Sequence, residues 1–265
     1  MQTSVSAGIS ICISAGQKAS KEIDDAGDII YEESMDNMIP DRLYTAGDMV
    51  KIGCNDCQGC SYCCQEMGES VVLTPFDICE LTLHLEESFD ELMEDKIELY
   101  MTDGMVMPNL KMTGKTEAYG FREVCGFLNS DGRCGIHAFR PGLCRLFPLG
   151  RNYEIKQTET ADGMEEIKGF RYFIVKDSCP KLPGTKVKIE KWLGVPNLKK
   201  YEDFIITWHY FCREFQTKMQ KLLAAGEDEK VKKLNLSMLE LFYRKPYEKE
   251  RNFYEQFEER MGSFK

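Results

Sequence analysis

The sequence predicts an α+β protein, in which a loop-rich cysteine-cluster domain with a small antiparallel sheet precedes C-terminal amphipathic helices. Three observations support this prediction. Cysteines crowd into residues 54–64 and recur in glycine- and proline-rich loops as far as Cys179. Short alternating segments, typical of strands, lie among those loops. From residue 197 onward, apolar residues return every three or four positions, which is typical of helices.

Composition divides the 265 residues into three parts. Residues 1–50 are acidic and lack a clear hydrophobic period, so we expect a mobile lead-in. Residues 51–184 carry most of the cysteines and are expected to form the metal-binding domain. Residues 185–265 have helical periodicity, and we expect a helical extension that packs on that domain.

Local capping signals place the helices. Thr74-Pro75 predicts a helix start, because threonine caps helices and proline suits their first turn. Ser88 is a second expected cap, and the apolar spacing after it predicts a helix that continues through Tyr100. Further helices are expected over residues 197–224, 228–244 and 248–260.

The strands are shorter and are predicted from alternation. Val71–Leu73 and residues 106–112 each indicate a strand. Residues 152–157 and 166–175 predict a hairpin joined around Asp162-Gly163, because apolar and polar side chains alternate in its second strand.

Charge and cysteine content exclude some classes of protein. The net charge of −10 disfavours broad nucleic-acid binding, which needs a basic surface. No apolar stretch reaches the roughly 18 residues of a membrane span. The N-terminus lacks the features of a secretory signal, and eight of the 12 cysteines fall into a metal-binding pattern. We therefore expect a cytoplasmic protein with reduced thiols, no nucleic-acid partner and no membrane partner.

The cysteine run predicts a metal centre. Cys57, Cys60 and Cys63 follow C-x2-C-x2-C spacing, and Cys179 precedes a proline far along the chain. Iron–sulfur proteins use such a run with a distant Cys-Pro, whereas structural zinc commonly uses two separate C-x2-C knuckles. The spacing favours iron–sulfur and leaves zinc as the second choice.

A second group of cysteines allows more than one centre. Neighbouring side chains diverge, so Cys63 and Cys64 do not easily ligate one ion together. With Cys125, Cys134 and Cys144 there are enough thiols for two centres, or for one centre and a redox-active thiol pair.

The remaining candidates divide between ligands and structural residues. Cys54 continues the spacing one step back and is either a ligand or only a neighbour of the site. Cys79 and Cys212 have core spacing on expected helices. Two arginines flank Cys144, where guanidinium groups either offset thiolate charge or hold a substrate anion.

Three segments resemble one known family. CQGCSYCC, VVLTPFDICELT and CGFLNSDGRCGIHAFRPGLCRLFPLG are similar to the CxxCxxCC cysteine-cluster family, a zinc- or iron-chelating domain related to flagellin lysine N-methylases. The resemblance covers roughly residues 54–180 and implies metal chelation without fixing an activity. The ligands that it implies are Cys57, Cys60, Cys63, Cys64, Cys125, Cys134, Cys144 and Cys179.

Three functions follow as expectations. The first is a protein that holds an iron–sulfur cluster of the 4Fe–4S type, with zinc as the alternative metal and a redox or structural role. The second is a cluster-dependent protein-lysine N-methyltransferase, and the third is a zinc-stapled interaction module without catalysis. A protein substrate or a redox partner is expected; an enzyme would be an oxidoreductase or a methyltransferase, and no catalytic residue is assigned.

Overall fold

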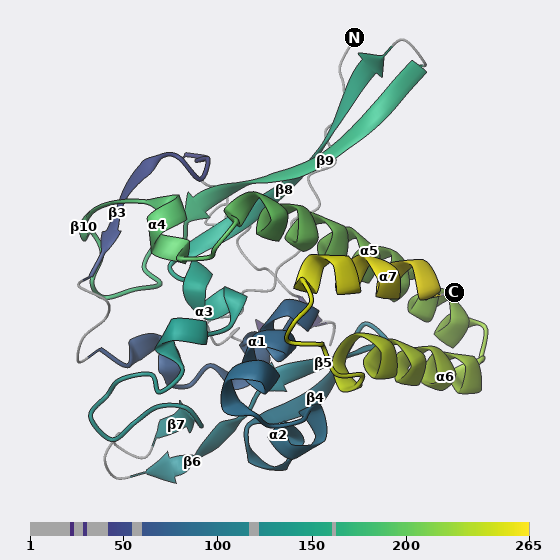
Figure 1. Cartoon of the computed structure of the whole chain (residues 1–265), viewed down its shortest axis with the longest axis horizontal. Helices are drawn as coiled ribbons and strands as arrows, with labels where there is room; N and C mark the ends of the chain where they lie inside the picture. The colour runs from purple at the N-terminus through teal and green to yellow at the C-terminus, as the bar shows by residue number, and fades with distance from the viewer. Residues whose placement is uncertain are drawn as a thin grey trace.

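The structure is a computed structural model that describes residues 42–54, 60–116, 122–160 and 163–264, together with the short strands β1 (Glu22–Ile23) and β2 (Ile29–Ile30). Its helices and antiparallel strands confirm the predicted α+β class (Figure 1). Cys57 and most of the expected lead-in lie outside the described residues. No helix in these ranges is both long and apolar enough to cross a membrane.

The strands of the described ranges pair into separate two-stranded antiparallel sheets, including β1 with β2. The predicted antiparallel pairing is therefore present as several small sheets. The other pairs are β3 (Met49–Gly53) with β10 (Thr185–Lys188), β4 (Ile97–Thr102) with β5 (Met105–Leu110), β6 (Met112–Thr116) with β7 (Arg122–Cys125), and β8 (Leu149–Thr160) with β9 (Gly163–Ile174).

Capping boxes begin the first two helices at the predicted residues. Thr74 caps α1 (Pro75–Leu85), where its hydroxyl accepts from the Asp77 amide and the Asp77 carboxylate accepts from the Thr74 amide. Ser88 and Glu91 form the same pair at the start of α2 (Phe89–Asp95). Each box satisfies amide groups that the first turn of a helix leaves unpaired.

The predicted continuation of the second helix through Tyr100 is wrong, because α2 ends at Asp95 and β4 follows. Asp103 and Gly104 join β4 to β5 with φ angles of 52° and 76°. A two-residue turn with positive φ at both positions is a strong hairpin signal. It overrides the apolar spacing of three and four residues that Ile97 and Tyr100 share with a helix.

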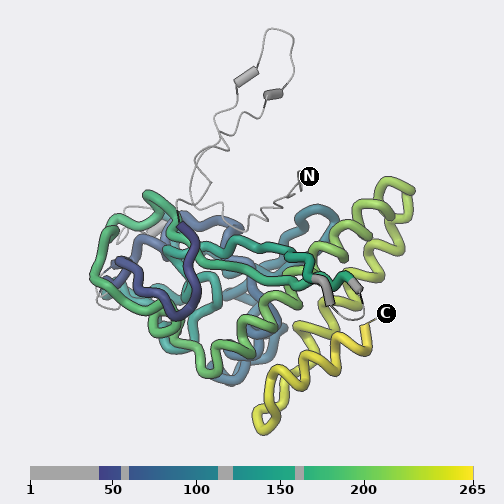
Figure 2. The backbone as a smooth tube through the Cα atoms, turned by 90° about the horizontal axis from the view of Figure 1, so that it is seen from above, coloured from purple at the N-terminus to yellow at the C-terminus, as the bar shows by residue number. Residues whose placement is uncertain are grey.

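The long hairpin β8–β9 confirms the predicted one and extends it at both ends. Figure 1 shows its tip projecting beyond the labelled helices and the other labelled strands. Its base lies along α5 (Leu198–Ala224), as Figure 2 also shows. Tyr153 of β8 stacks on His209 of α5 with ring centroids 3.5 Å apart, and the Tyr210 hydroxyl donates to the Glu154 carbonyl oxygen at 3.3 Å.

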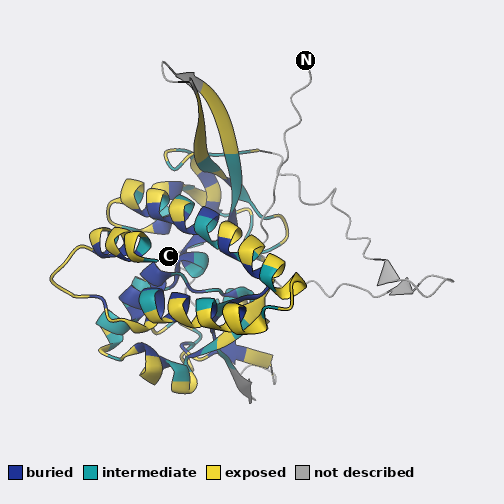
Figure 3. Cartoon of the chain, turned by 90° about the vertical axis from the view of Figure 1, so that its right-hand side faces the viewer, coloured by how far each residue is buried: buried dark blue, intermediate teal, exposed yellow. Residues whose placement is uncertain are grey.

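Three C-terminal segments contain most of the helical residues that the structure describes. Asn197 caps α5 as predicted, and Gly226 ends the segment with a φ of 71°. α6 (Asp228–Leu239) continues into the π-helical turn η7 (Glu240–Arg244), and α7 (Phe253–Ser263) begins after its own cap, Asn252. Buried residues line the inner face of these helices and exposed residues the outer face (Figure 3).

The main hydrophobic core joins these helices to the cysteine-rich part of the chain. Phe76 of α1 contacts Tyr201 of α5, with 5.1 Å between ring centroids. Trp208 of α5 lies 5.2 Å from Phe242. Cys125 is buried in the same core. The C-terminal helices therefore share one apolar interior with the segments that carry the cysteines.

A second, smaller core lies beside the first. It is built from β3, the base of the long hairpin, and two short helices, α3 (Gly142–Leu146) and α4 (Ile189–Leu193). Its buried members are Val50, Ile52, Leu146, Leu149, Tyr172, Ile189 and Leu193.

Candidate metal centre

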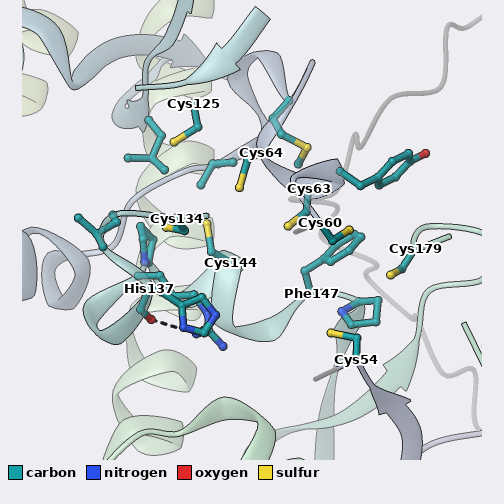
Figure 4. A pocket seen from close by; sticks show the side chains of 18 of the residues that line it. Cys54, Cys60, Cys63, Cys64, Cys125, Cys134, His137, Cys144, Phe147 and Cys179 are labelled. Carbon is teal, nitrogen blue, oxygen red and sulfur yellow. Dashed lines mark hydrogen bonds between the residues drawn. The ribbon is translucent and has the colours of Figure 1, made fainter. Parts of the chain in front are cut away.

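Eight cysteines line one cavity (Figure 4). The cavity has a volume of about 1070 Å³ out to its open mouth, and it is bordered by Ile52 of the smaller core and by Val71 and Leu110 of the main core. None of the eight thiols is in a disulfide. The cysteines are Cys54, Cys60, Cys63, Cys64, Cys125, Cys134, Cys144 and Cys179.

Seven of the eight cysteines that the sequence implicates are therefore together, and the eighth, Cys57, lies outside the described residues. Cys54 joins them, although its spacing left its role open. Cys79 and Cys212 do not line the cavity: Cys79 is buried in the main core and Cys212 packs against it. This agrees with the structural role expected for both.

Backbone pairing holds Cys64 beside Cys125. Gln65 forms an isolated antiparallel bridge with Val124 of β7, and the Glu66 amide donates to the Glu123 carbonyl oxygen at 2.8 Å. The residues just before Gln65 and just after Val124 are thereby brought to one end of this short ladder.

A tight loop returns Cys134 to the same place. Cys134 forms a bridge with Leu128, and the Gly135 amide donates to the Phe127 carbonyl oxygen at 2.8 Å. A side chain at position 135 would have its Cβ 3.3 Å from that oxygen, so glycine suits this close approach.

A buried carboxylate fixes the helix that carries Cys144. Oδ1 of Asp77 accepts from the Gly142 amide at 2.7 Å, while Oδ2 accepts from the Thr74 amide and hydroxyl. Asp77 is only 2% exposed. It therefore ties the first turn of α3 to the first turn of α1, which sequence spacing gave no reason to expect.

The β3–β10 pairing brings the last pair of cysteines together. Cys54 directly follows β3, whose Gly53 pairs with Thr185 of β10. The Gly184 amide donates to the Lys51 carbonyl oxygen at 2.8 Å. Cys179 lies in the turn just before this ladder, so it faces the same end of the cavity as Cys54 (Figure 4).

The adjacent thiols of Cys63 and Cys64 interact directly. Interaction with the Cys64 thiol lowers the pKa of Cys63, and the positive charge of Arg140 also contributes. The same interaction, together with burial, raises the pKa of Cys64.

Burial governs the deeper thiols. It raises the pKa of Cys125 to about 11 and raises that of Cys144 well above its ordinary value. Repulsion from neighbouring thiolates adds to the effect at Cys144. A cation that bound here would therefore remove an electrostatic penalty, because it would compensate charges that the cavity otherwise disfavours.

Among the residues that the structure describes, positively charged side chains line the cavity wall and no carboxylate does. Arg133, Arg140 and Lys181 line the cavity. Nη1 of Arg140 lies 2.9 Å from Nε2 of His137 and donates to the His137 carbonyl oxygen at 3.0 Å. Arg145 is buried outside the cavity and donates to the Ala138 carbonyl oxygen at 2.8 Å, so its role is structural.

The donor set fits a soft metal. Within the described ranges, no three histidine, cysteine or acidic side chains are arranged to hold a metal ion as they stand, so the thiols would have to turn toward one another. Their chemistry is nevertheless that of zinc and iron–sulfur ligands, since eight thiols outside any disulfide face the cavity and the described part of its wall contains no carboxylate.

Comparison with known proteins agrees with this geometry. Residues 56–180 match the model of the CxxCxxCC family, described as "Putative zinc- or iron-chelating domain". No curated protein and no solved structure gives a match. The matched segment contains seven of the eight cysteines that line the cavity. Residues 56–180 of this chain thus belong to the CxxCxxCC family, a zinc- or iron-chelating domain.

Proposed function

We propose that this protein holds iron–sulfur through its clustered cysteines, in the form of a 4Fe–4S centre, and that zinc is the alternative metal. The observation that carries the proposal is a single cavity to which the described residues contribute eight thiols and no aspartate or glutamate. Hard cations such as Mg²⁺ and Ca²⁺ prefer oxygen ligands, so this donor set selects against them.

The apolar wall of the cavity favours a cluster over a single zinc ion. Ile52, Leu110 and Trp192 contribute apolar surface to it. An apolar surrounding and hydrogen bonds to sulfur are the means by which proteins tune iron–sulfur potentials.

The centre would have a structural role at minimum. Its ligands come from three separate parts of the chain, and a metal between them would cross-link those parts. A redox role requires in addition that the centre be reduced reversibly, in exchange with a partner protein. Reduced thiols also need a reducing compartment, which supports a cytoplasmic location.

Anaerobic purification of the full chain tests the proposal. Iron, zinc and acid-labile sulfide would be measured per chain, together with the visible absorption spectrum. Equal amounts of iron and sulfide, in multiples of about four per chain, with a broad visible band are expected for a cubane centre. Zinc without sulfide would show that the site is a structural zinc site and not a cluster. A metal-free protein would contradict the proposal.

A redox titration separates the two roles. A reversible loss of the visible band on reduction, with recovery on reoxidation, is expected for an electron-transfer centre. A centre that is destroyed by reduction would have a structural role only.

A further inference from the structure

We propose that the eight thiols form two centres of four ligands each, an inner set of Cys64, Cys125, Cys134 and Cys144 and an outer set of Cys54, Cys60, Cys63 and Cys179. This inference rests on the proposed metal-binding function and assigns which cysteines share a centre. It holds for iron–sulfur and for zinc alike.

Ligand number is the first argument. One zinc ion or one cubane cluster takes four cysteine ligands. Eight thiols around one cavity are twice that number. The described residues alone therefore supply two complete ligand sets.

Contact with the main core divides the eight thiols into two groups of four. Cys125 is buried in that core, and Cys64, Cys134 and Cys144 pack against it. The remaining four belong to neither hydrophobic core. The division thus follows the packing of the molecule and does not depend on spacing in the sequence.

The backbone gives the same division for the five cysteines whose segments it pairs, which are Cys64, Cys125 and Cys134 in one group and Cys54 and Cys179 in the other. The Gln65–Val124 bridge places Cys64 beside Cys125, and the Leu128–Cys134 bridge returns Cys134 to them. The β3–β10 ladder independently joins the segments of Cys54 and Cys179. Two separate sets of backbone hydrogen bonds thus organise two groups of thiols.

Cys63 and Cys64 are placed in different groups because Cys64 packs against the main core and Cys63 does not. Cys63 lies where the two groups meet, next to Cys64 in the short helix Tyr62–Cys64. Figure 4 shows Cys54 and Cys179 across the cavity from Cys125 and Cys134.

Cobalt(II) titration tests the division. The full-length apoprotein would be titrated anaerobically with cobalt(II) alone, whose absorption bands report thiolate coordination. Wild type is expected to bind two equivalents, and Cys134→Ser and Cys179→Ser one each. The double variant Cys134→Ser with Cys179→Ser, which removes one ligand from each set, should bind almost no cobalt. Cys63→Ser combined with Cys179→Ser, which removes two ligands from the outer set, should still bind one equivalent.

Two controls and two outcomes complete the test. Cys212→Ala should retain both equivalents, and circular dichroism should show that every variant is folded. Loss of all cobalt in either single variant, or two equivalents in Cys179→Ser, would overturn the division while leaving the proposed function intact. A folded wild type that binds no cobalt, zinc or iron would overturn both.

Discussion

The inner and outer sets of thiols differ in what surrounds them. The inner set contacts the main core, and Cys125 is only 7% exposed. The outer set sits at the end of β3, in the cysteine run and in the turn before β10, beside exposed residues such as Tyr62 and Lys181. A metal in the inner set would therefore be part of the folded interior, while one in the outer set would be closer to solvent. Cysteine ligands in the inner set would thus stabilise the fold, whereas those in the outer set would leave the metal more accessible for reaction.

The largest effect is expected from removing a buried ligand. Cys125→Ser should lower the free energy of unfolding of the metal-loaded protein by on the order of 5 kcal/mol, since metal-binding energy is also folding energy. Cys60→Ser should cost about 1–2 kcal/mol, because its site does not contact a core. Urea unfolding under anaerobic conditions measures both. Equal losses would show that the two sets do not differ in their coupling to the fold.

Asp77, which is not one of the proposed ligands, should also affect metal binding by the inner set alone. Asp77→Ala removes the acceptor for Gly142 and Thr74 and should cost about 2–4 kcal/mol, because buried amides lose their partners. Metal bound by the inner set should fall while metal bound by the outer set remains. The matched control is Ser88→Ala, a capping loss of about 1 kcal/mol at an exposed helix start. A fall in outer-set metal would refute the separation.

Crowding at α3 offers a finer test. A Cβ at Gly142 would lie 2.3 Å from the Tyr201 hydroxyl oxygen, so Gly142→Ala should displace that ring at a cost of about 1–3 kcal/mol. Gly169→Ala is the control, since its Cβ would meet no atom within 4 Å. Thermal unfolding with metal analysis would show a reduced inner centre for the first variant only. A stable Gly142→Ala with full metal content would mean that α3 tolerates movement.

The smallest effect comes from a site remote from both sets. Burial, with Arg213 and Arg151 nearby, lowers the pKa of His209 from 6.5 to about 4. The unfolded chain therefore binds a proton that the folded chain rejects, and stability falls as the pH drops from 6.5 toward 4. His209→Gln should reduce this loss by about 1 kcal/mol at pH 5, allowing for partial exposure. Parallel pH profiles for both proteins would contradict the assignment.

Local signals predicted much of the fold. Thr74 and Ser88 were identified as helix caps because capping involves residues three positions apart. The helix predicted through Tyr100 is wrong because the Asp103-Gly104 hairpin turn outweighs the helical spacing of the apolar residues before it. The two-stranded β3–β10 ladder was missed, since its strands are separated by nearly the whole cysteine domain and no pattern links them.

The site was predictable to the same extent as the fold: local patterns were informative and long-range pairings were not. Thiol spacing indicated Cys60, Cys63 and Cys179, because ligand chemistry limits the residue types and the distances between them. The resemblance to the CxxCxxCC family implied the other four of the seven predicted cysteines that line the cavity. Cys54 could not be assigned, since only the distant β10 strand explains its place. Asp77 had a visible role as a capping residue, but its bond to Gly142 spans 65 positions and leaves no mark in the sequence.

The β3–β10 ladder also affects the order in which the two sets of thiols are completed while the chain is synthesised. A growing chain exposes all four inner thiols once residue 144 has emerged, whereas the outer set stays incomplete until Cys179 and the strand that follows it are available. Closing so long a loop costs conformational entropy that local pairing does not. Metal delivered during translation would therefore meet the inner ligands first, and the outer ligands would be filled only when the ends of the domain have met.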